Sequence, residues 1–228
     1  MTRVETMNYS FAPIRPVAGY SPWLDDPDFR ALQESVKEYT LVDVFRLHEL
    51  YALVRQLGKL PEGDILEVGV WRGGSGALLA GTAKLCGLDS HIYLADTFQG
   101  VVKAGEKDSK YTGGEHADTS VTTVEQLLGR MGLGNCELLQ GVFPDQTGAR
   151  ISDRKFRLCH IDVDVYNSAH DVNEWVWPRL VTGGMVVYDD YGFEPCIGVT
   201  RYVNEQLDQP DRMVLHNLNG HAIVIKLR

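Results

Sequence analysis

Short apolar runs alternate along this chain with longer stretches in which apolar residues recur every three or four positions. The short runs are typical of buried strands, and the longer stretches are typical of helices that pack through one face. Regular alternation of the two predicts an α/β fold with a doubly wound, mostly parallel sheet. The predicted strands cover residues 64–68, 91–96, 136–140, 156–163, 185–188, 213–217 and 222–227.

Capping residues and glycines predict where the helices begin and end. Asp26-Pro27 is a cap followed by a proline in the first turn, and either Thr119 or Ser120 caps a later helix. Asn167-Ser168 is the predicted cap of the helix that follows the fourth strand. The predicted helices cover residues 27–39, 43–57, 120–131, 167–180 and 197–207, and a further helix starts at Ala77.

The last two predicted strands flank Asn219-Gly220, a dipeptide that strongly favours a β-hairpin turn. This hairpin adds a C-terminal antiparallel strand to the parallel sheet. Five parallel strands closed by such a hairpin resemble the plan of the class I methyltransferases, a Rossmann-like fold. A Rossmann dehydrogenase would lack the hairpin.

A length of 228 residues fits one large domain with a buried core. We predict that residues 1–42 form an N-terminal arm and helix, and that residues 43–228 form the main domain. Residues 97–119 are polar, contain several glycines and show no periodicity. A segment of this length is typical of a functional lid or a disordered loop, so we expect a lid there.

The charge of the chain narrows the range of partners. The net charge is −9, whereas nucleic acids and anionic membranes bind basic surfaces, so neither is expected as the main partner. No apolar block typical of a signal peptide or a membrane span is present, and we expect a cytoplasmic protein. The four cysteines form no CxxC pair, which suggests neither a zinc site nor a disulfide framework.

The glycine-rich stretch that follows the first strand predicts a ligand site. A strand, a glycine turn and a helix N-terminus let a ligand approach unpaired backbone N–H groups. The glycines are Gly69, Gly73, Gly74 and Gly76, a spacing that differs from the dinucleotide fingerprint. Glu67, at the end of the strand, would repel a pyrophosphate but could bind an ammonium group. This combination favours S-adenosylmethionine over NAD, with a glycine-rich turn without ligand as the alternative.

The residues at the ends of the next two strands extend this predicted cofactor site. Asp96 lies where a doubly wound nucleotide fold places the carboxylate that binds ribose hydroxyls, although an aspartate that merely starts a turn is the alternative. Gly141 and Phe143 follow the third strand, and we assign them to the cofactor-binding set as well.

Four carboxylates end two predicted strands, Asp162 and Asp164 on one and Asp189 and Asp190 on the next. Ligands of doubly wound sheets bind beyond the carboxyl ends of the strands, so we expect all four to meet there. A hard divalent cation such as Mg²⁺ would relieve their repulsion. A nearby carboxylate could then take the proton of a substrate hydroxyl, and the hydroxyl oxygen would attack the methyl group of S-adenosylmethionine. The alternatives are a capping cluster and a solvated loop, and His160 is expected to be a core histidine.

Four segments resemble the macrocin-type sugar O-methyltransferases. They are residues 67–75 (EVGVWRGGS), 96–100 (DTFQG), 161–168 (IDVDVYNS) and 187–191 (VYDDY), and the resemblance extends from about residue 46 to residue 206. Members of this family are Mg²⁺-dependent enzymes that act on deoxysugars of macrolides and aminocoumarins. The resemblance implies a class I fold and, as in many members, self-association into a homo-oligomer.

The resemblance also implies roles for single residues. The first two segments, which contain Arg72, Gly73 and Ser75, would hold S-adenosylmethionine, and Arg46 would contact the cofactor or close over it. Asp162, Asp189 and Asp190 would bind the metal, and Asp164 would be the general base. Val163 departs from the family, which usually has glycine between the two aspartates.

The predicted function is therefore Mg²⁺-dependent transfer of a methyl group from S-adenosylmethionine to a hydroxyl of a deoxysugar on a secondary metabolite. The substrate would be a small glycosylated molecule. Two alternatives stay open. One is methylation of a catechol or another phenol, and the other is a non-catalytic relative that acts as a binding partner. A nicotinamide-dependent reductase is disfavoured by Glu67 and the glycine spacing.

Overall fold

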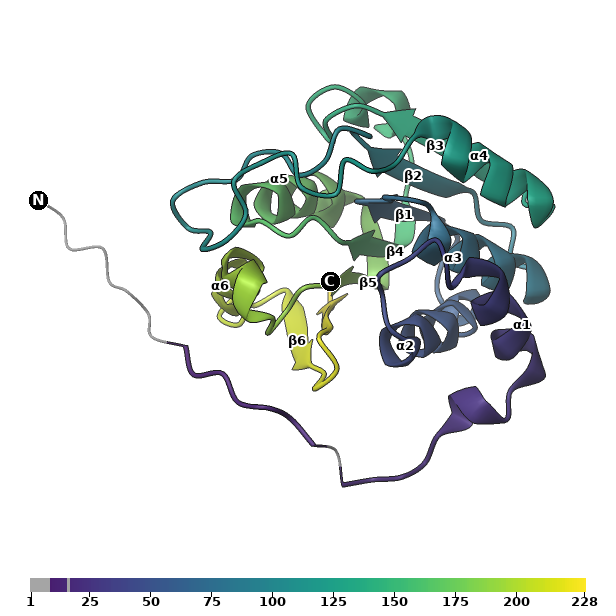
Figure 1. Ribbon diagram of the computed structural model, residues 1–228, viewed down its shortest axis with the longest axis horizontal. Helices are drawn as coiled ribbons and strands as arrows, with labels where there is room; N and C mark the ends of the chain where they lie inside the picture. The colour runs from purple at the N-terminus through teal and green to yellow at the C-terminus, as the bar shows by residue number, and fades with distance from the viewer. Residues whose placement is uncertain (1–8, 16) are drawn as a thin grey trace, which may run out of the picture.

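The computed structural model describes residues 9–15 and 17–228 (Figure 1). The first eight residues and residue 16 of the predicted arm lie outside the described residues. Within the described part of the chain, seven strands form one sheet in the order β3-β2-β1-β4-β5-β7-β6. The strands are β1 (Asp64–Val68), β2 (Ile92–Asp96), β3 (Cys136–Gln140), β4 (Phe156–Ile161), β5 (Leu180–Tyr188), β6 (Arg212–His216) and β7 (Ala222–Lys226).

The direction of winding changes between β1 and β4. Neighbouring strands from β3 to β5 pair in parallel, whereas β7 pairs antiparallel with both β5 and β6. The chain moves outward from β1 through β2 to β3 and then returns to β4 on the other side of β1. Such a switch point opens a crevice at the carboxyl ends of β1 and β4. The predicted doubly wound sheet with its C-terminal antiparallel hairpin is confirmed.

Helices cover both faces of the sheet, as Figure 1 shows. One core lies between the sheet and α1, α2, α3 and α4, and a second core lies between the sheet and α5 and α6. The helices are α1 (Pro27–Val36), α2 (Val44–Val54), α3 (Gly74–Leu85), α4 (Val121–Arg130), α5 (Tyr166–Val176) and α6 (Ile197–Glu205).

Several helix boundaries follow the predicted caps. The side chains of Asp26, Asp43 and Ser120 accept backbone N–H bonds at the starts of α1, α2 and α4. The helix predicted after the fourth strand is present as α5, but its predicted cap was wrong, because the helix begins at Tyr166 after Val165, which provides no side-chain cap.

The predicted caps of α5 have other partners. Asn167 Nδ2 donates to the carbonyl of Lys103, and Ser168 Oγ donates to the carbonyl of Val102. These residues therefore anchor the 97–119 segment instead of capping their own helix. Strand β5 also differs from its prediction, because it starts at Leu180 and continues through Gly183, whose positive φ of 80° accompanies an irregular register with β4.

Helix α1 belongs to the same core as the main domain. Phe29 and Val36 are fully buried in the cluster that also contains α2 and α3, and Gly74 N donates to the carbonyl of Tyr39. The packing therefore continues across the boundary that we predicted at residue 43. Residues 17–21 are exposed apart from Ser21, which is half-buried, and the described arm runs along the outside of the molecule (Figure 1).

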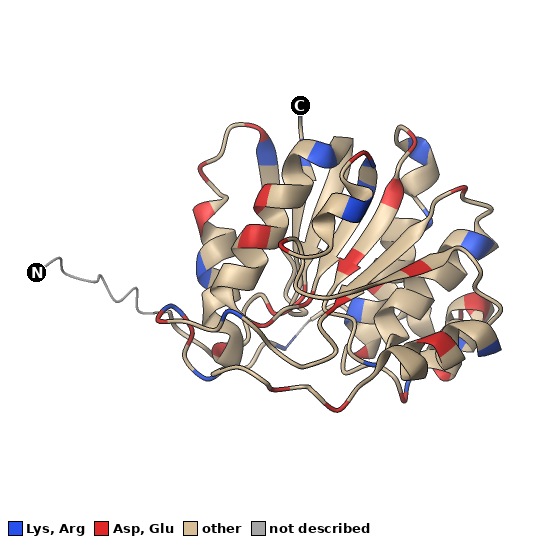
Figure 2. Cartoon of the chain, turned by 90° about the horizontal axis from the view of Figure 1, so that it is seen from above, with Lys and Arg blue, Asp and Glu red and all other residues tan. Residues whose placement is uncertain are grey.

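Charged residues are distributed over many elements. Figure 2 shows lysine and arginine interspersed with aspartate and glutamate along the helices and loops. Among the described residues, no helix is both long enough and apolar enough to cross a membrane.

Candidate active site

A cavity of about 290 Å³ opens at the carboxyl ends of the central strands. Its size lies near the lower end of the range for pockets that hold small molecules. The structure brings ten of the thirteen predicted site residues to its wall. They are Arg46, Gly69, Ser75, Asp96, Gly141, Phe143, Asp162, Asp164, Asp189 and Asp190.

Glu67 is one of the three predicted residues that do not line the cavity. Its side chain is fully buried in β1, where Oε1 lies 2.9 Å from Nδ1 of His160. Its other oxygen, Oε2, has no hydrogen-bond partner and faces the position of Gly76 on α3. In this structure Glu67 pairs with a histidine within the sheet, so the expected contact with a ligand ammonium group is not supported.

Arg72 and Gly73 also lie outside the cavity wall. Arg72 pairs with Asp118 at the end of the 97–119 segment, at 2.6 Å, and stacks on the ring of Trp71. Gly73 precedes α3 in the left-handed conformation, with φ 91°, which a glycine adopts without strain. These two residues shape the turn and its link to the predicted lid rather than the cavity itself.

Gly69 must be a glycine for two separate reasons. Its φ is +89°, and a Cβ atom at this position would lie 1.6 Å from the backbone carbonyl oxygen of Asp162. The first turn of the cofactor motif therefore packs directly on the backbone that carries the first aspartate of the acidic cluster.

The variant Gly69→Ala is expected to lower the free energy of unfolding by at least about 2 kcal/mol, because backbone strain and overpacking add. Urea unfolding measures the change. Gly87→Ala is the matched control, because Gly87 also has a positive φ, of +62°, but a Cβ atom there would meet nothing within 4 Å. Equal losses of unfolding free energy in the two variants would contradict the role of the close approach to Asp162.

Asp96 holds the glycine turn in place. Its Oδ2 accepts hydrogen bonds from the backbone N–H groups of Val70 and Trp71, at 2.7 and 2.9 Å, and its Oδ1 accepts one from Phe98 at 2.6 Å. Trp71 has a positive φ of 47°, so these bonds stabilise an unfavourable backbone conformation. Asp96 thus orders the turn and also lines the cavity, where its oxygens retain further lone pairs.

Three aspartates form the centre of the acidic cluster. Asp162, Asp189 and Asp190 each offer one carboxylate oxygen, and these oxygens lie within 4.8 Å of one another. The register of β4 and β5 explains this, because Ile161 pairs with Tyr188 and the following residues emerge side by side. Burial and the neighbouring carboxylates raise the pKa values of Asp162 and Asp190 well above their ordinary value. A divalent cation with oxygen ligands fits this site, because it would compensate buried negative charge.

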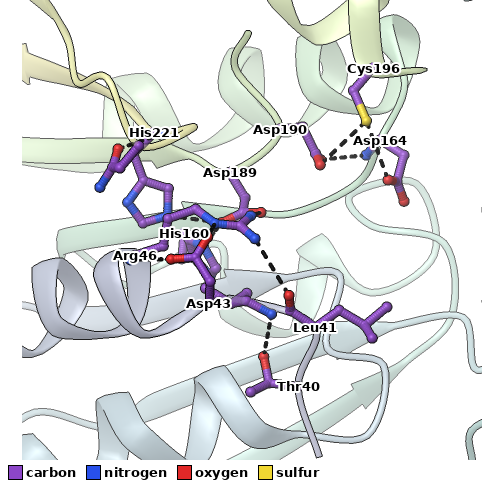
Figure 3. A network of polar contacts seen from close by, with 12 residues as sticks. Thr40, Leu41, Asp43, Arg46, His160, Asp164, Asp189, Asp190, Cys196 and His221 are labelled. Carbon is purple, nitrogen blue, oxygen red and sulfur yellow. Dashed lines mark hydrogen bonds and ion pairs between the residues drawn. The ribbon is translucent and has the colours of Figure 1, made fainter. Parts of the chain in front are cut away.

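Asp189 is held differently from its two neighbours. Burial alone raises its pKa, but contacts with His160, His221 and Arg46 outweigh that effect and hold the pKa well below its usual range. Arg46 pairs with its Oδ2, and His221 Nε2 lies 2.8 Å from its Oδ1 (Figure 3). Asp189 is therefore a charged carboxylate with partners on both oxygens.

Asp164 combines a strained backbone with partial burial. Its φ is +64°, and its backbone N–H donates to Oδ2 of Asp190 at 3.0 Å. Burial raises its pKa, against contacts with Tyr111, His116 and Cys196 that lower it. Unusual backbone geometry of this kind clusters at functional sites. The Asp164 side chain lines the cavity, where the Tyr111 and Cys196 side chains contact it.

Among the cavity-wall residues that the sequence analysis missed, Tyr111, His116 and Cys196 lie nearest to the acidic cluster in their contacts. Tyr111 and His116 lie in the 97–119 segment, which carries no periodic pattern, so nothing in the sequence indicated where their side chains lie. The Cys196 thiol is 3.4 Å from Oδ1 of Asp190 and 3.7 Å from Oδ1 of Asp164 (Figure 3). Val163, the departure from the resembled family, also lines the cavity.

The 97–119 segment covers one side of the cavity without forming a helix or a strand. Lys103 fastens it through ion pairs with Asp145 and Asp171, at 2.5 and 2.6 Å. Asp108 accepts the backbone N–H of Tyr166 at the start of α5. The segment is thus attached to the loop after β3 and to α5, in the place expected of a lid.

Comparison with known proteins decides the family. Residues 29–214, which include the whole cavity, match the family described as macrocin-O-methyltransferase. The chain belongs to this family. The resemblance noted in the sequence is confirmed, and the family's shared chemistry is O-methylation with S-adenosylmethionine as the methyl donor.

Two relatives of this chain are named as O-methyltransferases. The mycinamicin III 3''-O-methyltransferase of Micromonospora griseorubida is 31% identical over 171 residues, which is 69% of this chain and 67% of that protein. A Streptomyces olivaceus enzyme, named 8-demethyl-8-(2,3-dimethoxy-alpha-L-rhamnosyl)-tetracenomycin-C 4'-O-methyltransferase, is 31% identical over 169 residues, or 69% of this chain and 64% of that protein. The solved structure of the O-methyltransferase NovP shares the fold, with a TM-score of 0.70 at 24% identity over 83% of each chain.

Proposed function

We propose that this protein is a Mg²⁺-dependent O-methyltransferase that transfers the methyl group of S-adenosylmethionine to a hydroxyl of a deoxysugar on a secondary metabolite. The observation that carries the proposal is the convergence of Asp162, Asp189 and Asp190 beside Asp164 in a cavity walled by the glycine turn. Burial and neighbouring carboxylates raise the pKa values of Asp162 and Asp190, so their charged forms have no evident purpose in folding alone.

The cofactor would lie along the carboxyl ends of β1, β2 and β3. Gly69 and Ser75 border this part of the cavity from the turn, and Asp96 borders it from the end of β2. Gly141 and Phe143 close it beyond β3, where the Phe143 ring packs edge-on against Trp175 with ring centres 4.9 Å apart. An ordered turn and a fixed aromatic side chain are suited to holding one orientation of a ligand.

The metal ion would be held by the carboxylates of Asp162, Asp189 and Asp190. When bound, Mg²⁺ supplies Lewis-acid chemistry that stabilises negative charge on a substrate oxygen. The three side chains come from the ends of adjacent strands β4 and β5, so a rigid sheet fixes their spacing. Arg46 balances part of the charge of Asp189 from helix α2.

Asp164 would act as the general base. Its carboxylate lies at the cavity wall, two residues from Asp162, and its backbone is tied to Asp190. A raised pKa makes a carboxylate a better proton acceptor near neutral pH. Asp164 would take the proton of the acceptor hydroxyl as the oxygen bonds to the methyl carbon and the bond from that carbon to the sulfonium sulfur breaks, which leaves S-adenosylhomocysteine. The Tyr111 and His116 side chains of the lid border the same space.

The choice of a sugar hydroxyl draws support from the relatives. The tetracenomycin enzyme is named for a substrate that carries a rhamnosyl group, and the mycinamicin enzyme is named for O-methylation of mycinamicin III. A catechol or phenol acceptor and a non-catalytic binding role are the competing outcomes. Self-association, a cytoplasmic location and the lack of nucleic-acid and membrane partners stay predictions.

Calorimetric titration with S-adenosylhomocysteine, with Mg²⁺ and again with EDTA, tests the cofactor site without knowledge of the acceptor. We expect binding under both conditions, and no binding in either would overturn the proposal. Methyl transfer to a panel of deoxysugar glycosides and catechols then tests the acceptor. Transfer to glycosides that stops in EDTA is expected, whereas transfer to catechols alone would overturn the sugar assignment.

A further inference from the structure

A row of ionisable side chains crosses the sheet beneath helix α2. It consists of Glu67 on β1, His160 on β4, Asp189 after β5 and His221 before β7. The strand registers place these four side chains on one face of the sheet. Glu67 pairs with His160. Tyr188 pairs with Ala222, so Asp189 and His221 are the next pair of opposed positions. The row lies on the face of the sheet that carries the α1–α4 core.

The members of the row contact one another in sequence. His160 Nδ1 lies 2.9 Å from Glu67, and its Nε2 faces Asp189 Oδ1 at 3.7 Å, too far for a hydrogen bond. His221 Nε2 lies 2.8 Å from the same Asp189 oxygen, and its Nδ1 lies 2.6 Å from Oε2 of Glu49. Both histidine side chains are fully buried.

Helix α2 supplies the other end of this network. Arg46 and Glu49 are three residues apart, so they project from the same side of the helix toward the sheet. Arg46 binds Asp189 Oδ2, while Glu49 binds His221 and receives a hydrogen bond from Asn217 Nδ2 in the turn of the hairpin. The hairpin turn and the helix thus hold Asp189 between them.

His221 and Arg46 together fix the plane of the Asp189 carboxylate, because each occupies a different oxygen. Glu49 in turn orients the His221 ring by accepting at Nδ1. Carboxylates that bind a metal are usually themselves hydrogen-bonded by outer residues, which orient them. Glu49 is not among the residues that line the cavity.

We propose that His221 is a positioning residue for Asp189 and that Glu49 acts through His221, so that the C-terminal hairpin sets the cation affinity of the cavity. The inference rests on the proposed function, since it takes Asp189 as one of the cation-binding carboxylates. The competing explanation is that this buried pairing only stabilises the junction of α2 and the hairpin.

Titration with Mn²⁺, followed by its electron paramagnetic resonance signal, tests the inference in the full-length protein. Mn²⁺ prefers the same oxygen ligands as Mg²⁺. We expect His221→Ala to raise the Kd for Mn²⁺ by about 10–100-fold, and Glu49→Ala to raise it by less. His221→Gln keeps a hydrogen-bond donor near Asp189, so we expect it to bind Mn²⁺ more tightly than His221→Ala does. His170→Ala is the matched control, because His170 also lies 2.9 Å from a carboxylate, that of Asp171, but outside this network.

Thermal unfolding and S-adenosylhomocysteine binding, measured on the same variants, separate positioning from stability. A lower unfolding temperature with an unchanged Kd for Mn²⁺ in His221→Ala would overturn the inference, as would wild-type protein that binds no Mn²⁺. Wild-type protein that binds Mn²⁺ but not S-adenosylhomocysteine would contradict the proposed function alone. In that case the affinities of the variants for Mn²⁺ still decide the role of His221.

Discussion

Replacing Asp164 by asparagine is expected to slow methyl transfer by about 10²–10⁴-fold, the usual contribution of a general base. Asparagine tolerates the positive φ of 64° at this position nearly as well as aspartate does, so the backbone should keep its conformation. The amide cannot accept a proton near neutral pH, while the residues that border the proposed cofactor region are unchanged. S-adenosylhomocysteine affinity is therefore expected to stay within about twofold of wild type, since no contact is lost.

Single-turnover transfer to an accepted glycoside, together with calorimetry, measures both quantities. Asp153→Asn is the control, because this substitution removes the same charge from an exposed position in the connection before β4. Full activity of Asp164→Asn would exclude this residue as the base. Loss of S-adenosylhomocysteine binding would show that Asp164 acts on the cofactor instead.

Two adjacent aspartates are expected to respond in opposite ways when they are neutralised. The pKa of Asp190 is raised by burial and by the charges of Asp164 and Asp189, so its ionised form destabilises the cation-free fold. Asp190→Asn should therefore raise the unfolding temperature in EDTA, by about 2–4 °C for each kcal/mol by which the free energy of unfolding increases. Asp189→Asn should instead cost about 3–5 kcal/mol, because Arg46 and His221 lose their buried partner.

The sign of the pH dependence follows from the direction of each pKa shift. Folding raises the pKa of the Asp190 carboxyl group above 3.8, the value that we take for the unfolded chain. Such a group destabilises the folded protein increasingly as the pH rises above 3.8. The advantage of Asp190→Asn over wild type in EDTA should thus grow with pH above about 4. Scanning calorimetry across pH measures it, and a wild-type protein that is more stable than Asp190→Asn at neutral pH without cation would contradict this account. Both variants should lose cation binding.

The sheet and the acidic cluster were predictable because each depends on local pattern and on a general topological rule. Apolar runs located all seven strands, and the rule that ligands bind beyond the carboxyl ends of parallel strands brought Asp162 and Asp189 together. The side-chain period of two then decides which residues share a face, and it places Glu67 and His160 on the same face as Asp189 but deeper in their strands.

Other features depend on contacts that a single sequence does not reveal. Asn167 and Ser168 have the composition of a helix cap, but carbonyl groups of a segment more than sixty residues away take their hydrogen bonds. Arg46 lies off the apolar stripe of Val44, Leu47, Tyr51 and Val54, yet it is buried, with Asp189 as its counter-charge. The positions of Tyr111 and His116 depend on the path of a segment without periodicity, which only the folded chain defines.

The close approach of Gly69 to the carbonyl of Asp162 has a consequence for the order in which ligands bind. No side chain separates the glycine turn from the start of the acidic cluster, and Asp162 N also donates to the carbonyl of Val68 just before the turn. Any shift of the turn on cofactor binding must therefore move the backbone of Asp162. Thermodynamic reciprocity requires that such coupling act equally in both directions, so the cation should tighten cofactor binding by the same factor as the cofactor tightens cation binding.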